Sequence, residues 1–176
     1  MKRKTLRNVI FLLVSLAVLP CAVEELFASS PHFDFNIQSH HLIIQMDPSR
    51  HLLKAEDRLE IDVKRGRSPT LSLLLNPHLK ISRIVDQRTG QPLSWSEANF
   101  SAHANRLDLS LQEMEEPLSL SISYEGSIYD PIVKEKELPF VRGDKTSGLV
   151  GSEGVYLSSD SHWYPDRPDS IATFQV

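Results

Sequence analysis

The chain has 176 residues and a formal net charge of −4 at pH 7, with 24% charged side chains. This mild acidity argues against nucleic acid, DNA or RNA, and against an anionic membrane surface as its partner. The sequence holds one cysteine, Cys21, which excludes an internal disulfide and a site built from several thiolates. A stable fold must therefore depend on a core of buried apolar side chains.

The first 28 residues have the organisation of an export signal. Lys2, Arg3, Lys4 and Arg7 precede an apolar run over residues 9–19, which ends at Pro20. The run is shorter than the roughly 20 apolar residues that a membrane-spanning helix needs, which favours a cleaved signal peptide. Lipid attachment at Cys21 is the weaker alternative, because Pro20 stands where a small residue is needed.

We therefore expect a signal peptide over residues 1–28 and a mature β-domain over residues 29–176. The expected location is the periplasm or the extracellular space, with membrane association if the signal is retained. Cleavage after Ala28 removes four basic and two acidic side chains and moves the formal charge from −4 to −6. The roughly 148 remaining residues are enough to build one hydrophobic core.

Apolar and polar residues alternate through most of the chain from Phe33 onward, which is the pattern of half-buried β-strands. Phe33, Phe35 and Ile37 form the first run, and Leu42, Ile44 and Met46 form the second, before the turn sequence Asp47-Pro48-Ser49. Further runs lie at residues 59–63, 71–75, 79–85, 107–111 and 118–124. Residues 86–91 are expected to form a hairpin connection around Gly90, and residues 113–117 an acidic turn.

These strands follow one another without an amphipathic helix longer than two turns or an internal repeat. They predict an all-β domain, either an antiparallel saddle-like β-sandwich or a curved sheet. Residues 127–153 lack sustained periodicity and predict a long loop or a pair of irregular excursions. Ala172, Phe174 and Val176 predict a last strand, and no turn or polar tail closes it. We therefore expect the chain to be the front part of a longer protein.

The seven histidines form no recognisable ligand set. His40 and His41 are adjacent, so on a strand their side chains point to opposite faces and cannot bind one ion. Neither an H-E-x-x-H pair nor a G-x-S-x-G elbow occurs in the sequence. We expect surface or strand-edge histidines, and we assign the chain no catalytic residue, no metal ligand and no cofactor.

An aromatic cluster near the end of the sequence is the remaining candidate for binding. Trp163, Tyr164 and Pro165 closely follow Tyr156. Exposed aromatic side chains offer a flat surface with a polar handle, which suits a peptide or a glycan. We favour the alternative that Trp163 and Tyr164 close the end of the sheet, because the nearby prolines stiffen a crossing segment.

Several segments, in this order, resemble the N-terminal β-domain of the alanyl aminopeptidase family of gluzincin zinc metallopeptidases. They are "HHLIIQMDPSRHLLKAEDRLEIDV", the leucine-rich strand that ends at Asn76, "SISYEG" at 121–126, "GVYL" at 154–157 and "WYPDRPDSIATFQV". In that family a strand ending in Tyr-x-Gly is followed by G-x-Y, an aromatic-Pro turn with Asp-x-Pro, and Ala-x-Phe. The resemblance covers most of residues 33–176.

The resemblance implies a saddle-like β-domain that precedes a thermolysin-like catalytic domain. The family's G-x-M-E-N segment and H-E-x-x-H zinc motif do not occur here, so no catalytic or zinc-binding residue carries over. Family members have a Thr-Gln-aromatic-Glu element beside the substrate's free amine. The corresponding stretch, residues 157–160, lacks the glutamine and offers the carboxylate of Asp160. We assign Tyr156, Asp160, Trp163 and Tyr164 as candidates for the edge of a substrate site.

Two functional hypotheses follow. The first is a non-catalytic scaffold domain of an exported zinc-aminopeptidase-like protein, from a divergent branch of the family and truncated before its catalytic domain. This domain would flank the active-site cleft of a downstream catalytic domain or partner chain, and zinc would bind only there. The second is a self-contained exported module that binds a peptide or a glycan through Tyr156, Trp163 and Tyr164.

Overall fold

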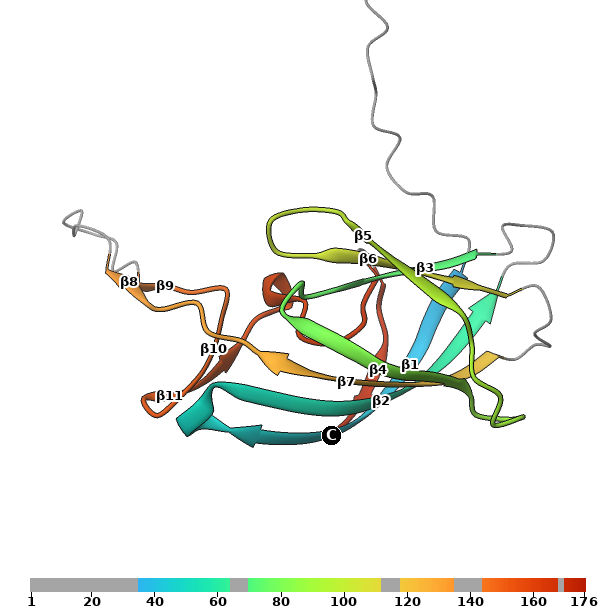
Figure 1. Ribbon diagram of the computed structural model, residues 1–176, viewed down its shortest axis with the longest axis horizontal. Helices are drawn as coiled ribbons and strands as arrows, with labels where there is room; N and C mark the ends of the chain where they lie inside the picture. Colours follow the sequence, from blue (N-terminus) through green and yellow to red (C-terminus); the bar gives the residue numbers. More distant parts are fainter. Residues whose placement is uncertain (1–34, 64–69, 112–117, 135–143, 168–169) are drawn as a thin grey trace, which may run out of the picture. The chain divides into compact units, whose positions relative to one another are not determined.

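The described part of the chain is built from β-strands (Figure 1). The computed structural model describes residues 35–63, 70–111, 118–134, 144–167 and 170–176. They belong to the second of two units, His32–Val176, so the predicted signal peptide lies outside the described residues. The strands are β1 (Phe35–Asp47), β2 (Leu52–Val63), β3 (Thr70–Leu75), β4 (Leu79–Asp86), β5 (Trp95–Asn99), β6 (Asn105–Ser110), β7 (Leu118–Ser127), β8 (Val133–Lys134), β9 (Asp144–Lys145), β10 (Gly148–Gly151), β11 (Gly154–Leu157) and β12 (Thr173–Gln175).

Two sheets make up most of the fold. The larger has the strand order β12-β1-β2-β7-β4, and the smaller has the order β3-β6-β5. All pairings in them are antiparallel except that of β12 with β1. The prediction of an all-β domain with antiparallel curved sheets is therefore confirmed. In the described ranges no helix is long and apolar enough to cross a membrane.

The long β1–β2 hairpin closes at the predicted Asp47-Pro48-Ser49 turn. A 3₁₀ turn, η1 (Pro48–Arg50), occupies this position, and the Asp47 carboxylate accepts hydrogen bonds from the Ser49 N–H at 3.1 Å and the Ser49 hydroxyl at 2.6 Å. His51 follows with φ of 58°, and its Nδ1 lies 2.8 Å from the Val150 carbonyl oxygen. This turn fixes which residues of β1 and β2 lie opposite each other.

The two strands expected before this turn are a single strand, β1. Its register against β2 shifts between Ile37 and Ser39, so one residue is accommodated as a bulge. Phe35 and Ile37 are buried before the shift, and His40 and Leu42 are buried after it. The bulge thus changes the inward positions from odd to even, which explains why the sequence looked like two separate runs.

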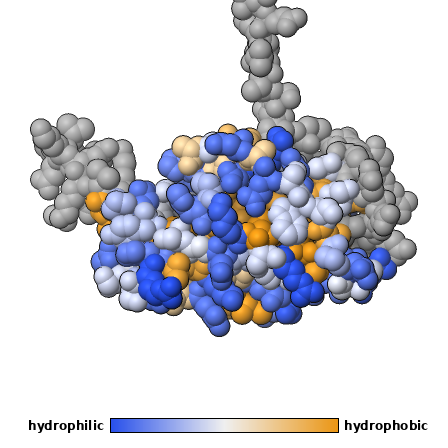
Figure 2. Space-filling view, viewed as in Figure 1, coloured by the Kyte–Doolittle hydropathy of each residue, from blue (hydrophilic) through white to orange (hydrophobic). Residues whose placement is uncertain are grey.

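The core lies between the two sheets. Leucines of β3 and β6 pack in one cluster with the inward residues of β1, β2, β4 and β7. Leu71, Leu73 and Leu109 have no exposed surface, and neither do Leu59 and Leu120 from the larger sheet. Figure 2 shows apolar residues along the middle of the visible face, with hydrophilic residues above and below. Burial of alternate side chains on both sheets therefore holds the fold together.

The prediction of a long loop or irregular excursions over residues 127–153 is wrong for the described residues of that range, which include paired strands. Gly148–Gly151 and Gly154–Leu157 pair as the hairpin β10–β11, joined through Ser152 and Glu153. Strand β5 was also not predicted, because all five of its residues are exposed. The predicted turn at 113–117 lies outside the described residues. The last predicted strand is confirmed as β12, which pairs in parallel with β1.

Candidate functional site

A histidine and an aspartate form a buried polar pair on the inner face of the larger sheet. Nδ1 of His40 lies 2.7 Å from Oδ2 of Asp57, and the side chains of both residues have no exposed surface. His40 comes from β1 and Asp57 from the neighbouring β2. The expectation that the histidines lie at the surface is wrong for His40, because the bulge turns its side chain inward. As predicted, His41 on the other face is partly exposed.

Aromatic rings from the C-terminal segment cover this pair. The Phe174 ring stacks on the His40 ring with centroids 4.8 Å apart, and the Tyr164 ring meets His40 edge-on at 5.1 Å. Tyr164 also makes an edge contact with Phe174 at 5.4 Å. Because Phe174 lies directly opposite His40 in the β1–β12 pairing, the last strand places its ring over the imidazole.

Burial sets the electrostatics of the cluster. It raises the pKa of Asp57, while the hydrogen bond from His40 opposes that increase. Burial also raises the pKa of Asp166, and burial together with the Asp166 charge raises the pKa of Tyr164 to about 12. Burial holds the pKa of Tyr124 well above its usual value. The tyrosines here are therefore neutral at physiological pH. For Asp57, burial disfavours the ionised carboxylate relative to the neutral acid.

The cluster contains more polar atoms than hydrogen bonds. Three of its buried atoms, His40 Nε2, Asp57 Oδ1 and the Tyr124 hydroxyl, have no hydrogen-bond partner within the described residues. A buried polar atom without a partner typically costs about 1–3 kcal/mol. A His–Asp pair orients the imidazole of a catalytic triad, but here the aromatic rings seal the pair from solvent. The arrangement can fix the C-terminal segment on the sheet, and a substrate cannot reach it.

The structure separates the four predicted site residues into two groups. Trp163 and Tyr164 contact each other edge-on at 4.9 Å, and both are partly buried against the core. Tyr156 is 54% exposed on β11, and Asp160 is exposed in the 3₁₀ turn η2 (Ser159–Ser161). Trp163 and Tyr164 thus take the position that a plug of the sheet requires, while Tyr156 and Asp160 remain available at the surface.

Sequence reasoning missed His40 and Asp57 as partners, although the sequence contains a signal for them. In β2 the inward positions hold Leu53, Ala55, Leu59 and Ile61, and Asp57 is the one carboxylate among them. A charged residue in an apolar alternation indicates a buried partner. No group of three or more metal-ligating side chains lies together in the part of the chain that the structure describes.

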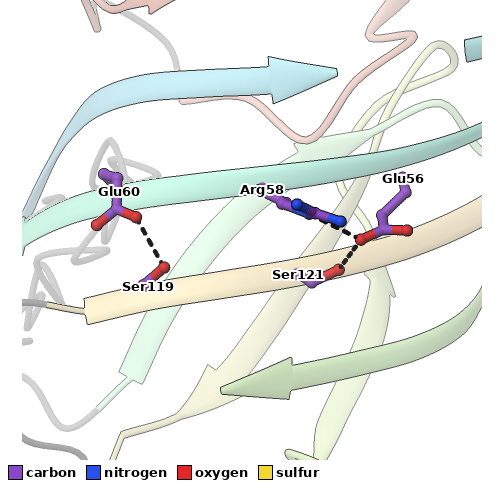
Figure 3. Close-up of polar contacts among 5 residues, drawn as sticks. All are labelled: Glu56, Arg58, Glu60, Ser119 and Ser121. Carbon is purple, nitrogen blue, oxygen red and sulfur yellow. Dashed lines mark hydrogen bonds and ion pairs between the residues drawn. The ribbon is translucent and has the colours of Figure 1, made fainter. Parts of the chain in front are cut away.

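The outer face of the larger sheet is polar. Figure 3 shows Glu56, Arg58 and Glu60 of β2 beside Ser119 and Ser121 of β7. The Ser119 hydroxyl donates to Glu60 at 2.8 Å, the Ser121 hydroxyl donates to Glu56 at 3.0 Å, and Arg58 Nε donates to Glu56 at 3.0 Å. The bonds from Arg58 and Ser121 lower the pKa of Glu56, with the Arg58 contribution the largest. Charged side chains paired in this way are typical of a face in contact with water.

The chain is similar in fold to zinc metallopeptidases of the M1 group. The M1 zinc metallopeptidase of Deinococcus radiodurans matches with a TM-score of 0.51 and 18% identity, over 81% of this chain and 31% of that chain. A mutant of that peptidase bound to the substrate Tyr-Ser-Ala matches at 0.51 and 17%, over 80% and 31%. Yeast LTA4 hydrolase gives a partial match of 0.48 and 13%, over 53% and 15%.

No protein-family model and no curated protein matches the chain. At 17–18% identity the Deinococcus matches establish a shared fold and not a shared activity. They span under a third of the length of the peptidase chains. The class that the fold defines is thus a β-domain of the kind found in M1 zinc peptidases, as the sequence resemblance predicted.

Proposed function

We propose that this domain is the non-catalytic N-terminal scaffold of an exported zinc-aminopeptidase-like protein. The observation that carries the proposal is the fold match, which includes four fifths of this chain and under a third of the M1 peptidase. Export is supported by the basic and apolar pattern of residues 1–28. In this proposal the domain flanks the active-site cleft, and zinc binds only in the catalytic domain.

The scaffold role requires a surface on which a further domain packs. Strand β12 offers such a surface, because it lies at the edge of the larger sheet and β1 is its one pairing partner among the described residues. Ile171 is 92% exposed and Phe174 is 50% exposed on this segment. Large apolar side chains beside an open strand edge are typical of an interaction surface. The outer face, with its paired charges (Figure 3), suits contact with water instead.

The C-terminal segment is anchored in a way that suits this role. The Leu74 N–H donates to the Asp166 carbonyl at 2.7 Å, and the Asp166 N–H donates to the Leu74 carbonyl at 2.9 Å. The Asn76 N–H donates to the His162 carbonyl at 2.8 Å. The segment that would lead into a catalytic domain is therefore fixed to β3 of the smaller sheet and to β1 of the larger one.

The coding sequence beyond the codon for Val176, read in the source genome, tests the scaffold role. The proposal expects an open frame that continues into an H-E-x-x-H motif. The longer product should then hydrolyse an alanine or leucine p-nitroanilide, and should lose this activity with a zinc chelator or when the motif glutamate is replaced by alanine. A verified stop codon at this position, without such a motif, would overturn the proposal.

One observation favours the second candidate, a module that binds a peptide or a glycan. Tyr129 and Tyr156 lie on either side of Leu149 in the backbone pairing, and they are 45% and 54% exposed while Leu149 is buried. His51 packs against Tyr129 with ring centroids 3.9 Å apart. Titration of a peptide and an oligosaccharide into wild type and Tyr156→Ala, followed by NMR, tests this candidate. Binding that disappears in the variant supports it, and absence of binding to both ligands contradicts it.

A further inference from the structure

A groove lies on the outer face of the larger sheet, beside the turn η1 that closes the β1–β2 hairpin. Its volume is about 610 Å³, which is within the range of small-molecule sites. Four neighbouring strands, β1, β2, β7 and β4, contribute to it. The residues that carry the argument are Gln45, Arg50, Leu52, Lys54, Lys80 and Glu125.

The strand register places four polar side chains of the groove in one row. Gln45 lies opposite Lys54, Lys54 lies opposite Glu125, and Glu125 lies opposite Lys80. Directly opposed residues in antiparallel strands have Cβ atoms roughly 4.5–5.5 Å apart, so their side chains interact. One glutamate therefore stands between two lysines, and it cannot neutralise both.

The ion pair between Lys54 and Glu125, in the middle of the row, is long and exposed to solvent. Lys54 Nζ lies 3.8 Å from Glu125 Oε2, and the side chains are 69% and 63% exposed. An exposed pair of this kind contributes little free energy, so breaking it for a ligand costs little. Lys80 Nζ donates to the Pro77 carbonyl at 3.2 Å, which leaves two of its three N–H donors for another acceptor.

The remaining charges of the groove also leave a positive excess. Arg50 enters from η1, and Asp47 is the second carboxylate. Ser49 donates two hydrogen bonds to Asp47 Oδ1, and these bonds hold the pKa of Asp47 below its usual range. Three cations therefore face two carboxylates, in a chain whose formal net charge is −4. A small anion is the complementary ligand.

The groove also has an apolar part. Leu52 precedes Lys54 by two residues in β2, so it lies on the same face of the sheet, where it is partly buried. An anion that carries an apolar group next to its charge would use both parts, whereas an inorganic anion would use only the cations.

We propose that this groove binds a small carboxylate with an adjacent apolar side chain and an amide. The carboxylate accepts hydrogen bonds from Lys80 and Lys54, with Arg50 at the rim. The apolar side chain packs against Leu52, and the Gln45 amide pairs with the ligand amide. A free acyl amino acid and the C-terminal residue of a peptide share this chemistry. The proposal does not depend on the scaffold function.

Calorimetric titration of the full chain with N-acetyl-leucine and with N-acetyl-leucinamide tests the proposal. The two probes differ only in the carboxylate, so we expect the acid to bind about tenfold or more tightly than the amide. Its affinity should fall between about 20 mM and about 200 mM salt, because the groove cations are exposed and screened. A tripeptide ending in leucine, tested with a free and an amidated C-terminus, shows whether a peptide end is also accepted.

Two variants with known charge changes locate the site. Lys54→Gln combined with Lys80→Gln should weaken acid binding by about tenfold. Arg83→Gln removes one cation from β4 outside the groove and should leave the affinity unchanged, which controls for the loss of a positive charge elsewhere on the sheet. Equal affinity for acid and amide would overturn the proposal, and so would wild-type binding by the folded double variant. Inorganic phosphate binding as tightly as N-acetyl-leucine would overturn the assigned ligand class.

Discussion

The imidazole ring of His40 lies parallel to the ring of Phe174, with 4.8 Å between centroids and 2° between planes. His40 belongs to β1 and Phe174 to β12, so this contact covers the inner face where the two strands pair. Asp57, from the neighbouring strand β2, is the hydrogen-bond partner of the imidazole. One buried histidine therefore links Asp57 in the core to the strand at the edge of the sheet.

Replacement of Asp57 by alanine should destabilise the domain by about 2–4 kcal/mol, because His40 would stay buried without its partner. Urea unfolding followed by tryptophan fluorescence measures this loss. Asp62→Ala is the matched control, since Asp62 is an exposed aspartate of the same strand and should change stability by less than about 0.5 kcal/mol. Equal effects of the two substitutions would show that the buried pair contributes nothing.

The stability of the domain should depend on pH through the titration of the Asp57 carboxyl group. Burial raises the pKa of Asp57 above the unfolded value of 3.8. Its contribution to stability is therefore fully present below that unfolded value and is lost as the pH rises through the folded pKa. The free energy of unfolding of wild type minus that of Asp57→Asn should fall as the pH rises above the unfolded pKa of 3.8 and through the raised folded pKa.

The other titratable groups near Asp57 are His40, His41, Tyr124, Tyr164 and Asp166. All remain in the Asp57→Asn variant, so they largely cancel in the difference. A repeat in a His40→Asn background removes the imidazole, and the fall should persist there and become larger, because His40 opposes the increase in the Asp57 pKa. If the difference in unfolding free energy between wild type and Asp57→Asn stays constant or rises with pH, the folded pKa of Asp57 is not raised.

Most of the fold was predictable because alternation survives where a strand has one buried face. The inward positions of β7 hold apolar residues or glycine, and those of β2 are apolar except for Asp57; the structure buries these positions of β2. The β10–β11 hairpin was missed because its strands are four residues long and glycine-rich, although two apolar runs around Ser152-Glu153 fit a two-residue turn. Strand β5 has no buried face, so no periodicity marks it.

The buried site was not predictable from local pattern alone. Whether His40 points inward depends on the bulge between Ile37 and Ser39, and a single sequence shows a bulge only as a change of parity. The cover supplied by Phe174 depends on a parallel pairing in which opposed residues, such as His40 and Phe174, are 134 positions apart in the sequence. Such long-range contacts are set by topology, and the alternation within each strand does not reveal them.

Replacement of Gly126 by alanine should destabilise the domain by about 2–3 kcal/mol. A Cβ atom there would lie 2.0 Å from the His78 carbonyl oxygen and 2.9 Å from its carbon, so backbone of the neighbouring connection must move. Gly90→Ala provides the contrast, because Gly90 has φ of +70° and open space around it. It should cost about 1 kcal/mol through backbone conformation alone. Thermal unfolding of both variants distinguishes steric exclusion from conformational strain.

Replacement of Phe174 by alanine should loosen β12 and expose the His40–Asp57 pair to water. We expect a loss of about 1–2 kcal/mol, because the ring is half-exposed yet stacks on His40 and contacts Tyr164. Hydrogen exchange at the amides of residues 173–175, which pair with β1, should become faster.

The control for this change is Ile171→Ala. Ile171 is 92% exposed, so its removal should alter stability by less than about 0.5 kcal/mol. In a longer product with a docked catalytic domain, both substitutions should weaken docking, since both side chains belong to the exposed apolar segment. Phe174→Ala with unchanged exchange on β12 would contradict its role as the cover of the buried pair. Normal docking of both variants would instead place the domain interface away from β12.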